Sequence, residues 1–470
     1  MDMLTLSLNT ESKIPLYHQL YSFIKTEIQS GRIPFDTKLP SKRKLSSYLK
    51  ISQNTIQAAY DQLMEEGYLV PLERRGVFVC KIDHVQKLQV QPQNDFTHNK
   101  EDLSSVAYDF SYHGVDFPTF PFATWRKLMK EVINEYDTEL LKLGDSLGSL
   151  QLRTAIAEYL HQSRGVNCKE NQVIISSGTE LLFQTLIQLF DKESIFGIEN
   201  PGYEKLNQLF TGNRAICKAI GIDRDGMLPE QIAISNANIL CITPAHQFPS
   251  GEIMPINRRI QLLNWANEAV GRYLIEDDYD SEFKYSGKPI PALQGLDTNE
   301  KVIYMGSLSK SLSPTIRVSY MVLPLHLMKR YLEKLSYILC PVPIMEQKVL
   351  TRFIQEGYFE RHLNKMRNIY KKKRDILVKA ISDLNCGIDI MGADAGLHLL
   401  LKIQNGKTEK ELVDSAFRQG VRVYGISKYY FEKNNPNKTP TIVIGYASMS
   451  EKEISKAVTV LYNAWYNCPI

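Results

Sequence analysis

The chain has 470 residues, of which 43% are hydrophobic and 23% charged, and its formal net charge is +4. This length suggests about two to four domains rather than one hydrophobic core, and so small a net charge excludes no class of partner by itself. There is no apolar run of about 18 residues, no signal-peptide pattern and no Cys-x-x-Cys pair, so we expect a cytoplasmic protein with reduced thiols, no membrane span and no metal site.

Residues 14–30 show the pattern of an amphipathic helix. One stripe at helical spacing holds the apolar residues Leu16, Leu20, Phe23, Ile24 and Ile28. Gly31 is placed to end this helix. A second helix is expected over residues 39–49, where Ser41 can act as N-cap and Leu45, Tyr48 and Leu49 can point inward.

A third helix and a hairpin are expected next. The third helix covers residues 53–66 and ends before Gly67. Residues 68–79 predict two short strands, with Arg74, Arg75 and Gly76 at the turn between them. Helix, turn, helix and basic hairpin together describe a winged helix-turn-helix over residues 1–82.

Such a domain would place the third helix in a major groove of a double-stranded DNA operator, with the hairpin reaching toward the flanking backbone. Cations at the start of the second helix would meet phosphates. The candidate DNA-binding residues are Lys42, Arg43, Gln53, Asn54, Thr55, Arg74 and Arg75. A small helical module that binds another protein is the alternative interpretation.

The segment LPSKRKLSSYLKISQNTIQAAYDQLMEEGYL, followed by RRGVFV, resembles the GntR-type winged helix along its length. One position departs from that pattern. Members usually carry arginine just after the serine that begins the recognition helix, whereas this chain has Gln53. Loss of a cation at this position should shift base preference without removing DNA binding.

Residues 83–106 predict a flexible connector, because they are rich in polar residues and keep no regular period. Strands and helices then alternate along residues 107–470. This alternation favours an α/β fold with a largely parallel sheet. We expect a mostly parallel large domain together with a smaller α+β domain.

Two strand ends in this part offer groups for a ligand. The strand before Ser177-Gly178-Thr179 opens onto a helix start, where the N–H groups of Gly178 and Thr179 and the Thr179 hydroxyl can bind an anion. An ordinary strand-to-helix turn is the alternative for Ser-Gly-Thr alone. Asn200-Pro-Gly-Tyr203 places an aromatic ring after the next strand, where a buried packing tyrosine is the alternative.

An acidic cluster, Glu276-Asp277-Asp278-Tyr279-Asp280, follows a further apolar run. Asp277 and Tyr279 face the same way because successive strand residues alternate between faces. A carboxylate there can keep a pyridinium nitrogen protonated, and a tyrosine can hydrogen-bond a ring hydroxyl. A solvated strand end is the alternative for such a cluster alone.

A lysine between two hydroxyl residues lies in Ser307-Leu-Ser309-Lys310, with Arg317 seven residues after Lys310. This arrangement suits a phosphate-bearing aldehyde cofactor, since Lys310 can form the Schiff base while Ser307, Ser309 and Arg317 hold the phosphate. A solvated loop is again the alternative for the motif alone.

The order of these pieces resembles the fold-type I pyridoxal-phosphate superfamily, to which aspartate aminotransferase belongs. The motifs TPAHQFPSG (243–251), EDDYDSEF (276–283) and YMGSLSKSL (304–312) further resemble the MocR/GabR regulators, which join a GntR winged helix to an aminotransferase-like body. This resemblance covers nearly the whole chain. It implies pyridoxal 5'-phosphate (PLP) as cofactor and a head-to-tail homodimer.

The resemblance also implies roles for single residues. Lys310 would carry PLP, Asp277 would pair with the pyridinium nitrogen, Tyr279 would bond the ring hydroxyl and Tyr203 would stack on the ring. The phosphate would lie among Gly178, Thr179, Ser307, Ser309 and Arg317. Ordinary aminotransferases use the asparagine of Asn-Pro-x-Gly for the ring hydroxyl, and His246 or Gln247 is expected to substitute here.

The effector is indicated by two substitutions. In GabR-type members the ligand's carboxylate meets arginines just after the Pro-Gly-Tyr tyrosine and in a Gly-x-Ser-Arg element, whereas this chain has Lys205 and Lys428. A lysine cannot make the planar two-bond fork, so a GABA-like ligand should bind worse. Arg422 is a candidate replacement, with a surface arginine in a strand as the alternative.

These features favour a DNA-binding transcriptional regulator with no catalytic residues. Members that lack the carboxylate-binding arginines include PdxR-type regulators of vitamin B6 synthesis, in which PLP is itself the signal. We therefore expect a PLP sensor. Two alternatives remain: a regulator whose effector is an amino compound that forms an external aldimine with PLP, and an active PLP-dependent aminotransferase.

Overall fold

The computed structural model describes residues 8–82, 106–134, 138–285, 290–431 and 439–466. The chain divides into two compact units, Met1–Lys100 and Glu101–Ile470. The connector predicted over residues 83–106 falls almost wholly outside the described residues. Among the helices of the described residues, none is long and apolar enough to cross a membrane.

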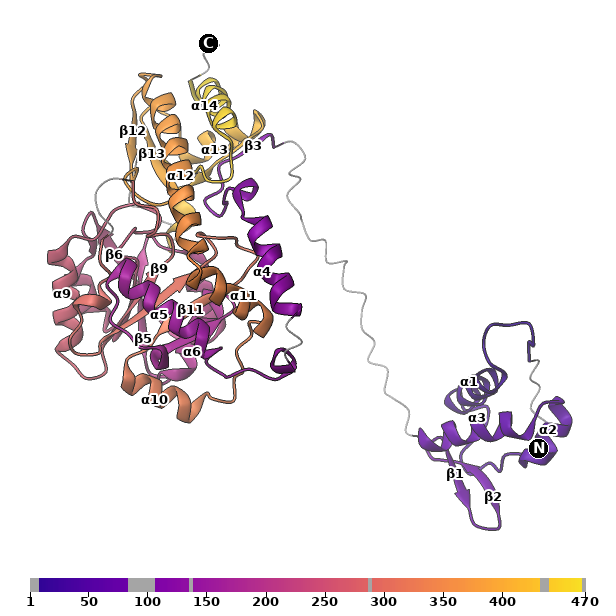
Figure 1. Cartoon of the computed structure of the whole chain (residues 1–470). Helices are drawn as coiled ribbons and strands as arrows, with labels where there is room; N and C mark the ends of the chain where they lie inside the picture. Colours follow the sequence, from indigo (N-terminus) through magenta and orange to yellow (C-terminus); the bar gives the residue numbers. More distant parts are fainter. Residues whose placement is uncertain (1–7, 83–105, 135–137, 286–289, 432–438, 467–470) are drawn as a thin grey trace. The chain divides into compact units, whose positions relative to one another are not determined.

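The smaller unit is a bundle of helices followed by an antiparallel hairpin (Figure 1). Its described elements are α1 (Leu16–Gln29), α2 (Lys42–Leu49), α3 (Gln53–Glu65), β1 (Leu69–Leu72) and β2 (Gly76–Val79). The Ser41 and Ser52 hydroxyls cap α2 and α3 by accepting from backbone N–H groups three residues on. The predicted order of three helices and a hairpin is confirmed.

The core of this unit corrects one detail of the sequence prediction. Leu20, Ile24 and Leu45 are fully buried, but Tyr48 is 43% exposed instead of pointing inward. Tyr48 lies about 60° around the helix from Leu45. Leu49 packs against the same core as Leu45, whereas Tyr48 is left in solvent.

The larger unit is built on an eight-stranded sheet with the order β4-β11-β10-β9-β8-β5-β6-β7. Strands β5, β6, β8, β9 and β10 run parallel, β11 is antiparallel to both of its neighbours, and β7 is antiparallel to β6. The strands are β4 (Val173–Ser176), β5 (Ile195–Asn200), β6 (Ile216–Asp223), β7 (Gly226–Met227), β8 (Ile239–Ile242), β9 (Tyr273–Asp278), β10 (Val302–Ser307) and β11 (Ser319–Val322).

Helices cover both faces of this sheet because its strands are apolar on both sides. In β4, Val173 and Ile175 pack toward α5, whereas Ile174 packs toward α6. One face carries α4 (Phe122–Asn134), α5 (Leu150–Arg164), α8 (Pro229–Ser235), α9 (Ile256–Asn267) and α11 (Ile344–Gln355). The other face carries α6 (Thr179–Leu189), α7 (Glu204–Gly212) and α10 (Leu325–Lys334).

A smaller antiparallel sheet with the order β12-β13-β16-β15 forms the second part of this unit (Figure 1). Its strands are β12 (Ile388–Met391), β13 (His398–Ile403), β15 (Tyr424–Gly425) and β16 (Thr441–Gly445). Its core also takes in residues of α12 (Tyr358–Ser382), α13 (Glu409–Arg418) and α14 (Glu451–Tyr466). The predicted α/β fold, with a mostly parallel large sheet and a smaller α+β part, is confirmed.

Short elements complete the larger unit. Strand β3 (Tyr108–Asp109) pairs in parallel with β14 (Val421–Arg422), so the first described residues of the larger unit join the side of the small sheet. The 3-10 turns are η2 (Phe117–Thr119), η3 (Thr138–Leu141), η4 (Glu170–Gln172), η5 (Gln294–Leu296) and η6 (Ile426–Tyr429).

Candidate functional site

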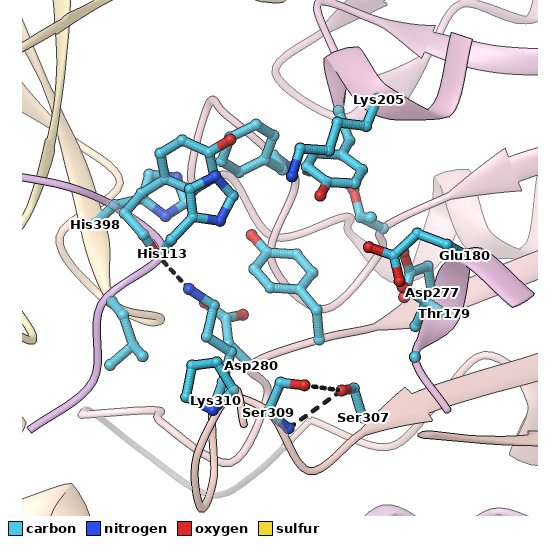
Figure 2. A pocket seen from close by; sticks show the side chains of 18 of the residues that line it. His113, Thr179, Glu180, Lys205, Asp277, Asp280, Ser307, Ser309, Lys310 and His398 are labelled. Carbon is cyan, nitrogen blue, oxygen red and sulfur yellow. Dashed lines mark hydrogen bonds between the residues drawn. The ribbon is translucent and has the colours of Figure 1, made fainter. Parts of the chain in front are cut away.

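A cavity of about 220 Å³ lies at one edge of the large sheet, where β4, β5, β8, β9 and β10 end. Figure 2 shows its walls converging from both parts of the larger unit. Its lining residues are Tyr112, His113, Gly178, Thr179, Glu180, Tyr203, Lys205, Thr243, Phe248, Asp277, Tyr279, Asp280, Ser307, Ser309, Lys310, Pro314, Arg317, Leu397 and His398. Most of the residues selected from the sequence therefore share one cavity.

Lys310 follows β10 and extends its ammonium group into this space. Its Nζ donates a hydrogen bond to the backbone carbonyl of Tyr112 (Figure 2). Burial lowers the pKa of Lys310 to about 8, although the nearby Asp280 carboxylate works in the opposite direction. A lysine with this pKa is largely available as a neutral amine at slightly alkaline pH, as a nucleophile requires.

Asp277, near the end of β9, supplies a carboxylate to the same cavity. Burial raises the pKa of Asp277 to about 7, and the carboxylates of Asp278 and Glu199 add to this effect. Its Oδ1 atom is buried and has no hydrogen-bond partner. A buried acceptor without a donor is destabilising, so this oxygen suits a ligand that brings an N–H group, such as a protonated ring nitrogen.

Two tyrosines complete the middle of the cavity. The Tyr279 hydroxyl donates to the backbone carbonyl of His246 at 2.9 Å. Tyr203 presents its ring beside Phe248, with ring centroids 6.1 Å apart and nearly perpendicular planes. Both tyrosines line the cavity together with Asp277, an arrangement that suits a flat aromatic ligand.

The end of the cavity beside α6 has the features of an anion site. Gly178 has φ of +91° and precedes the first residue of α6, Thr179. The Ser307 hydroxyl lies 3.0 Å from that of Ser309, and Arg317 pairs with Glu180 at 2.9 Å. A Cβ atom on Gly178 would lie 2.2 Å from the Arg317 guanidinium, so this space exists only with glycine.

The loop between β8 and α9 differs from the prediction. His246 lies behind Tyr279, not on the cavity wall, and its Nδ1 atom is 3.0 Å from the Tyr279 hydroxyl. The Gln247 amide is used within its own loop, where its Nε2 donates to the Phe248 carbonyl at 2.6 Å. Neither side chain lines the cavity, so the prediction that one of them contacts the ring hydroxyl of a ligand is wrong.

The two candidate effector lysines lie differently. Lys205, on α7, lines the cavity. The Lys428 ammonium, on η6, lies over three aromatic rings, 4.4 Å from the centroid of Tyr424, 4.7 Å from Tyr429 and 5.7 Å from Tyr112. Arg422 is not among the lining residues and stacks on the Tyr424 ring at 5.4 Å.

Among the lining residues that the sequence did not single out are Tyr112, His113, Asp280 and His398. Asp280 belongs to the acidic cluster, and its position after Tyr279 was a usable signal. Tyr112 and His113 lie about two hundred residues before Lys310 in the chain, and no local pattern connects them. His398 begins β13, where a mostly apolar and buried strand gives no sign of a ligand site.

His246, Asp280 and His398 are also the one group of metal-capable side chains among the described residues, with one atom of each within 4.8 Å of the others. His246 Nδ1, the Asp280 carboxylate and His398 Nε2 already take part in hydrogen bonds, whereas His246 Nε2 is buried without a partner. His246 Nδ1 lies 3.0 Å from the Asp280 carboxylate, and His398 Nε2 lies 3.1 Å from the Pro249 carbonyl. The geometry is therefore that of a hydrogen-bonded cluster.

The smaller unit presents the candidate DNA-binding residues on its surface. Arg43, Gln53 and Asn54 are exposed at the starts of α2 and α3, and Arg74 and Arg75 are exposed at the hairpin turn. Two of the predicted side chains also have contacts inside the unit. The Lys42 ammonium donates to Gln57, and the Thr55 hydroxyl lies 2.8 Å from that of Ser52.

Comparison with known families matches both units. Residues 16–79 match the bacterial regulatory proteins of the gntR family, and residues 101–461 match aminotransferase class I and II. Among solved structures, the kynurenine aminotransferase of Pyrococcus horikoshii, in complex with PMP, superposes with a TM-score of 0.69 at 24% identity. That match covers 77% of this chain and 91% of the enzyme, and it shows the fold of the larger unit.

Curated relatives match along nearly the whole chain. The uncharacterised HTH-type transcriptional regulator YdeL of Bacillus subtilis is 42% identical, over 97% of this chain and 98% of its own length. The probable rhizopine catabolism regulatory protein MocR of Rhizobium meliloti is 30% identical, over 98% and 96%. The pyridoxine biosynthesis transcriptional regulator PdxR of Corynebacterium glutamicum is 29% identical, over 97% and 99%.

The anion site leads to a first prediction. Gly178→Ala should weaken binding of pyridoxal phosphate by about tenfold or more, because its methyl group would enter the space beside Arg317 and the backbone would be strained at φ of +91°. Absorbance titration of the purified chain measures this change. The control is Gly212→Ala, since a Cβ atom there meets nothing within 4 Å. Equal affinities of the two variants would contradict an anion site at Gly178.

Proposed function

This chain belongs to the MocR/GabR family of transcriptional regulators, which join a GntR-type winged helix to an aminotransferase-like domain, and we propose that it senses PLP and controls vitamin B6 synthesis genes. Residues 1–82 bind the DNA operator, residues 83–106 connect the domains, and residues 107–470 bind the effector. A regulator that acts on DNA in this way works in the cytoplasm.

The observation that carries the proposal is the pairing of Lys310 with an unpartnered carboxylate atom in one cavity. Lys310 offers an amine with a lowered pKa, and Asp277 Oδ1 is a buried acceptor that lacks a donor. When bound, PLP would supply an aldehyde for the amine and a ring nitrogen for the carboxylate. Gly178, Thr179, Ser307, Ser309 and Arg317 would hold its phosphate, and Tyr203 and Tyr279 its ring.

PLP itself is favoured as the signal by the lysines at the effector positions. A lysine ammonium is a point charge and makes no planar pair of bonds with a carboxylate. Lys428 stacks on the rings of Tyr112, Tyr424 and Tyr429, which limits what it can offer a second ligand. The relative PdxR is named for pyridoxine biosynthesis, in agreement with a B6-related signal.

An amino compound as effector is the second candidate, and positive charge around His113 favours it. Burial lowers the pKa of His113 to about 4, and Lys310, Lys205 and Lys428 contribute to the lowering. Three ammonium groups near one side chain suit a ligand that carries a carboxylate. The amino group of such a ligand would react with the aldehyde of PLP.

Sensing is favoured over turnover. The relatives that match along the whole chain are named as regulators, while the enzymes match the larger unit. An aminotransferase also needs a residue that binds the carboxylate of the amino acid, normally an arginine that forms two hydrogen bonds with it. Mixing the PLP-loaded chain with amino acids and a keto acid should give little turnover, and rapid general transamination would support the enzyme alternative.

We propose a homodimer as the working form. Several large apolar side chains of the larger unit are exposed, including Phe122 at 62%, Leu141 at 81%, Leu143 at 85% and Tyr337 at 73%. Surfaces of this kind are used in protein–protein contacts. Two copies would also supply two winged helices, as recognition of a symmetric operator requires.

The chain segment that follows the connector offers a route from the cavity to the DNA-binding domain. After β3, this segment brings Tyr112 and His113 to the cavity wall, and the Tyr112 carbonyl accepts from Lys310. A ligand held by Lys310 removes that hydrogen bond, because the amine then has another partner. If this change couples the cavity to the DNA-binding domain, the effector changes the affinity for the operator, and the operator changes the affinity for the effector by the same factor.

A gel-shift experiment with and without PLP tests the proposal. PLP should change operator affinity of the wild-type chain and leave that of Lys310→Ala unchanged, because the variant has no amine for the aldehyde. Lys310→Ala should also lack the absorbance band that PLP gives with the wild type. An unchanged gel shift, with an amine altering it instead, would favour the second candidate.

The lowered pKa of Lys310 gives a pH prediction. Only the neutral amine attacks an aldehyde, so the capture rate should rise as the pH approaches about 8 and level off above it. An ordinary lysine, with a pKa of 10.5, would show the rise at a higher pH. Rapid-mixing absorbance measurements at several pH values check this, and a rate still rising steeply above pH 10 would contradict it.

The DNA interface is tested by removing single cations. Arg43→Ala or Arg75→Ala should weaken operator binding and lower the slope of log K against log salt by about 1, since each removes a phosphate contact. Arg32→Ala is the matched control, because Arg32 is an exposed arginine of the same unit that is paired with Glu27. Fluorescence anisotropy at several salt concentrations measures the slopes. An unchanged slope for both variants would place the interface elsewhere.

A further inference from the structure

A buried pair of side chains, His246 and Asp280, lies next to the cavity and is not used by the proposed function. They are 2% and 1% exposed. His246 Nδ1 lies 3.0 and 3.1 Å from the two oxygens of the Asp280 carboxylate. Asp280 lines the cavity, whereas His246 does not, so the imidazole can affect a ligand only through its neighbours.

The carboxylate decides where the imidazole carries its proton. An unprotonated Nδ1 facing both oxygens of Asp280 would be repelled, so Nδ1 carries a hydrogen. The Nε2 atom of His246 is buried and has no hydrogen-bond partner. The Tyr279 hydroxyl is 3.0 Å from the same Nδ1 and cannot donate to it. Its proton goes instead to the His246 carbonyl at 2.9 Å, which leaves its lone pairs for a ligand.

Gly396 closes this arrangement from the small-sheet side. It has φ of +70°, and a Cβ atom there would lie 2.3 Å from His246 Nδ1 and 2.6 Å from an Asp280 oxygen. The Gly396 carbonyl accepts from the hydroxyls of Tyr285 at 2.6 Å and Tyr446 at 2.7 Å. Because the chain packs so closely, no side chain fits at position 396. The imidazole N–H faces both oxygens of the buried Asp280 carboxylate and stabilises it.

The charge of Asp280 acts on Lys310. Both residues line the cavity, and the carboxylate raises the pKa of Lys310 against the larger, lowering effect of burial. The negative charge of Asp280 therefore favours the protonated form of a nitrogen at this position. The other titratable side chains near Asp280 are Asp277, Tyr279, Glu282, Tyr285, His398 and Tyr446.

We propose that His246 is a positioning residue of the candidate PLP site. Its N–H group holds Asp280 as a carboxylate beside Lys310, and its backbone carbonyl turns the Tyr279 proton away from the ligand. The asparagine of ordinary aminotransferases touches the ring directly, whereas this histidine acts through two intermediate side chains. The inference rests on the proposed binding of PLP at Lys310.

The test is a pH titration of visible absorbance of the full-length, PLP-loaded chain. Asp280→Asn removes the negative charge and should lower the pH midpoint by about one unit. His246→Phe should lower it similarly, since a buried carboxylate that has lost its donor takes up a proton. The double variant should shift no further than either single one, because both act through one charge. His246→Gln keeps an N–H donor and should stay nearer the wild type.

His326→Gln is the matched control. His326 lies between the Tyr273 hydroxyl at 2.8 Å and Glu300 at 3.2 Å, away from the cavity, so its variant should keep the wild-type midpoint. A His246→Phe midpoint equal to the wild type, with only weaker PLP binding, would reduce His246 to a packing role and overturn the inference. Shifts that add in the double variant would also overturn it.

Two further outcomes are separable. If His246→Phe does not fold, Asp280→Asn and His246→Gln decide the question, because the inference requires a larger shift for the first than for the second. A wild-type chain that gives no absorbance band with PLP would overturn the proposed function and this inference together. A normal wild-type band with an unmoved Asp280→Asn midpoint would overturn the inference alone.

Discussion

The parallel arrangement of β5, β8, β9 and β10 is the constraint on which the candidate site depends. Parallel strands all present their carboxyl ends at one edge of the sheet. Tyr203, Thr243, Asp277 and Ser307 therefore meet at one cavity although they are spread over about a hundred residues. The helices on both faces hold the strands in place, so the site rests on rigid elements rather than on loops alone.

Burial then gives these groups their chemical character. The same loss of water lowers the pKa of Lys310 and raises that of Asp277, so that both lie near neutrality. The unpartnered Asp277 oxygen and the open space beside Gly178 are features that a ligand would satisfy. By contrast, His246 Nδ1 and the Asp280 carboxylate already form hydrogen bonds with each other, which suits a supporting role.

In a regulator built on an enzyme fold, ligand binding must change the affinity of another part of the chain for DNA. In this protein, one segment runs from β3 to the cavity wall at Tyr112 and His113. The hydrogen bond from Lys310 Nζ to the Tyr112 carbonyl links that segment to the amine that is proposed to bind PLP. An aminotransferase needs a group that binds the carboxylate of its substrate. The proposed sensor instead needs a contact that ligand binding changes, such as this hydrogen bond.

The sequence alone determined the order of helices in the smaller unit and the α/β character of the larger one, because both depend on local periodicity. It also singled out Lys310, Asp277, Tyr279 and Gly178, because each lies in a motif made by its neighbours in the chain. Only the tertiary structure decided that Tyr112, His113 and His398 complete the cavity, that His246 lies behind Tyr279, and that Tyr48 faces solvent. Those outcomes depend on which distant segments pack together, and packing between distant segments leaves no periodic signal in the chain.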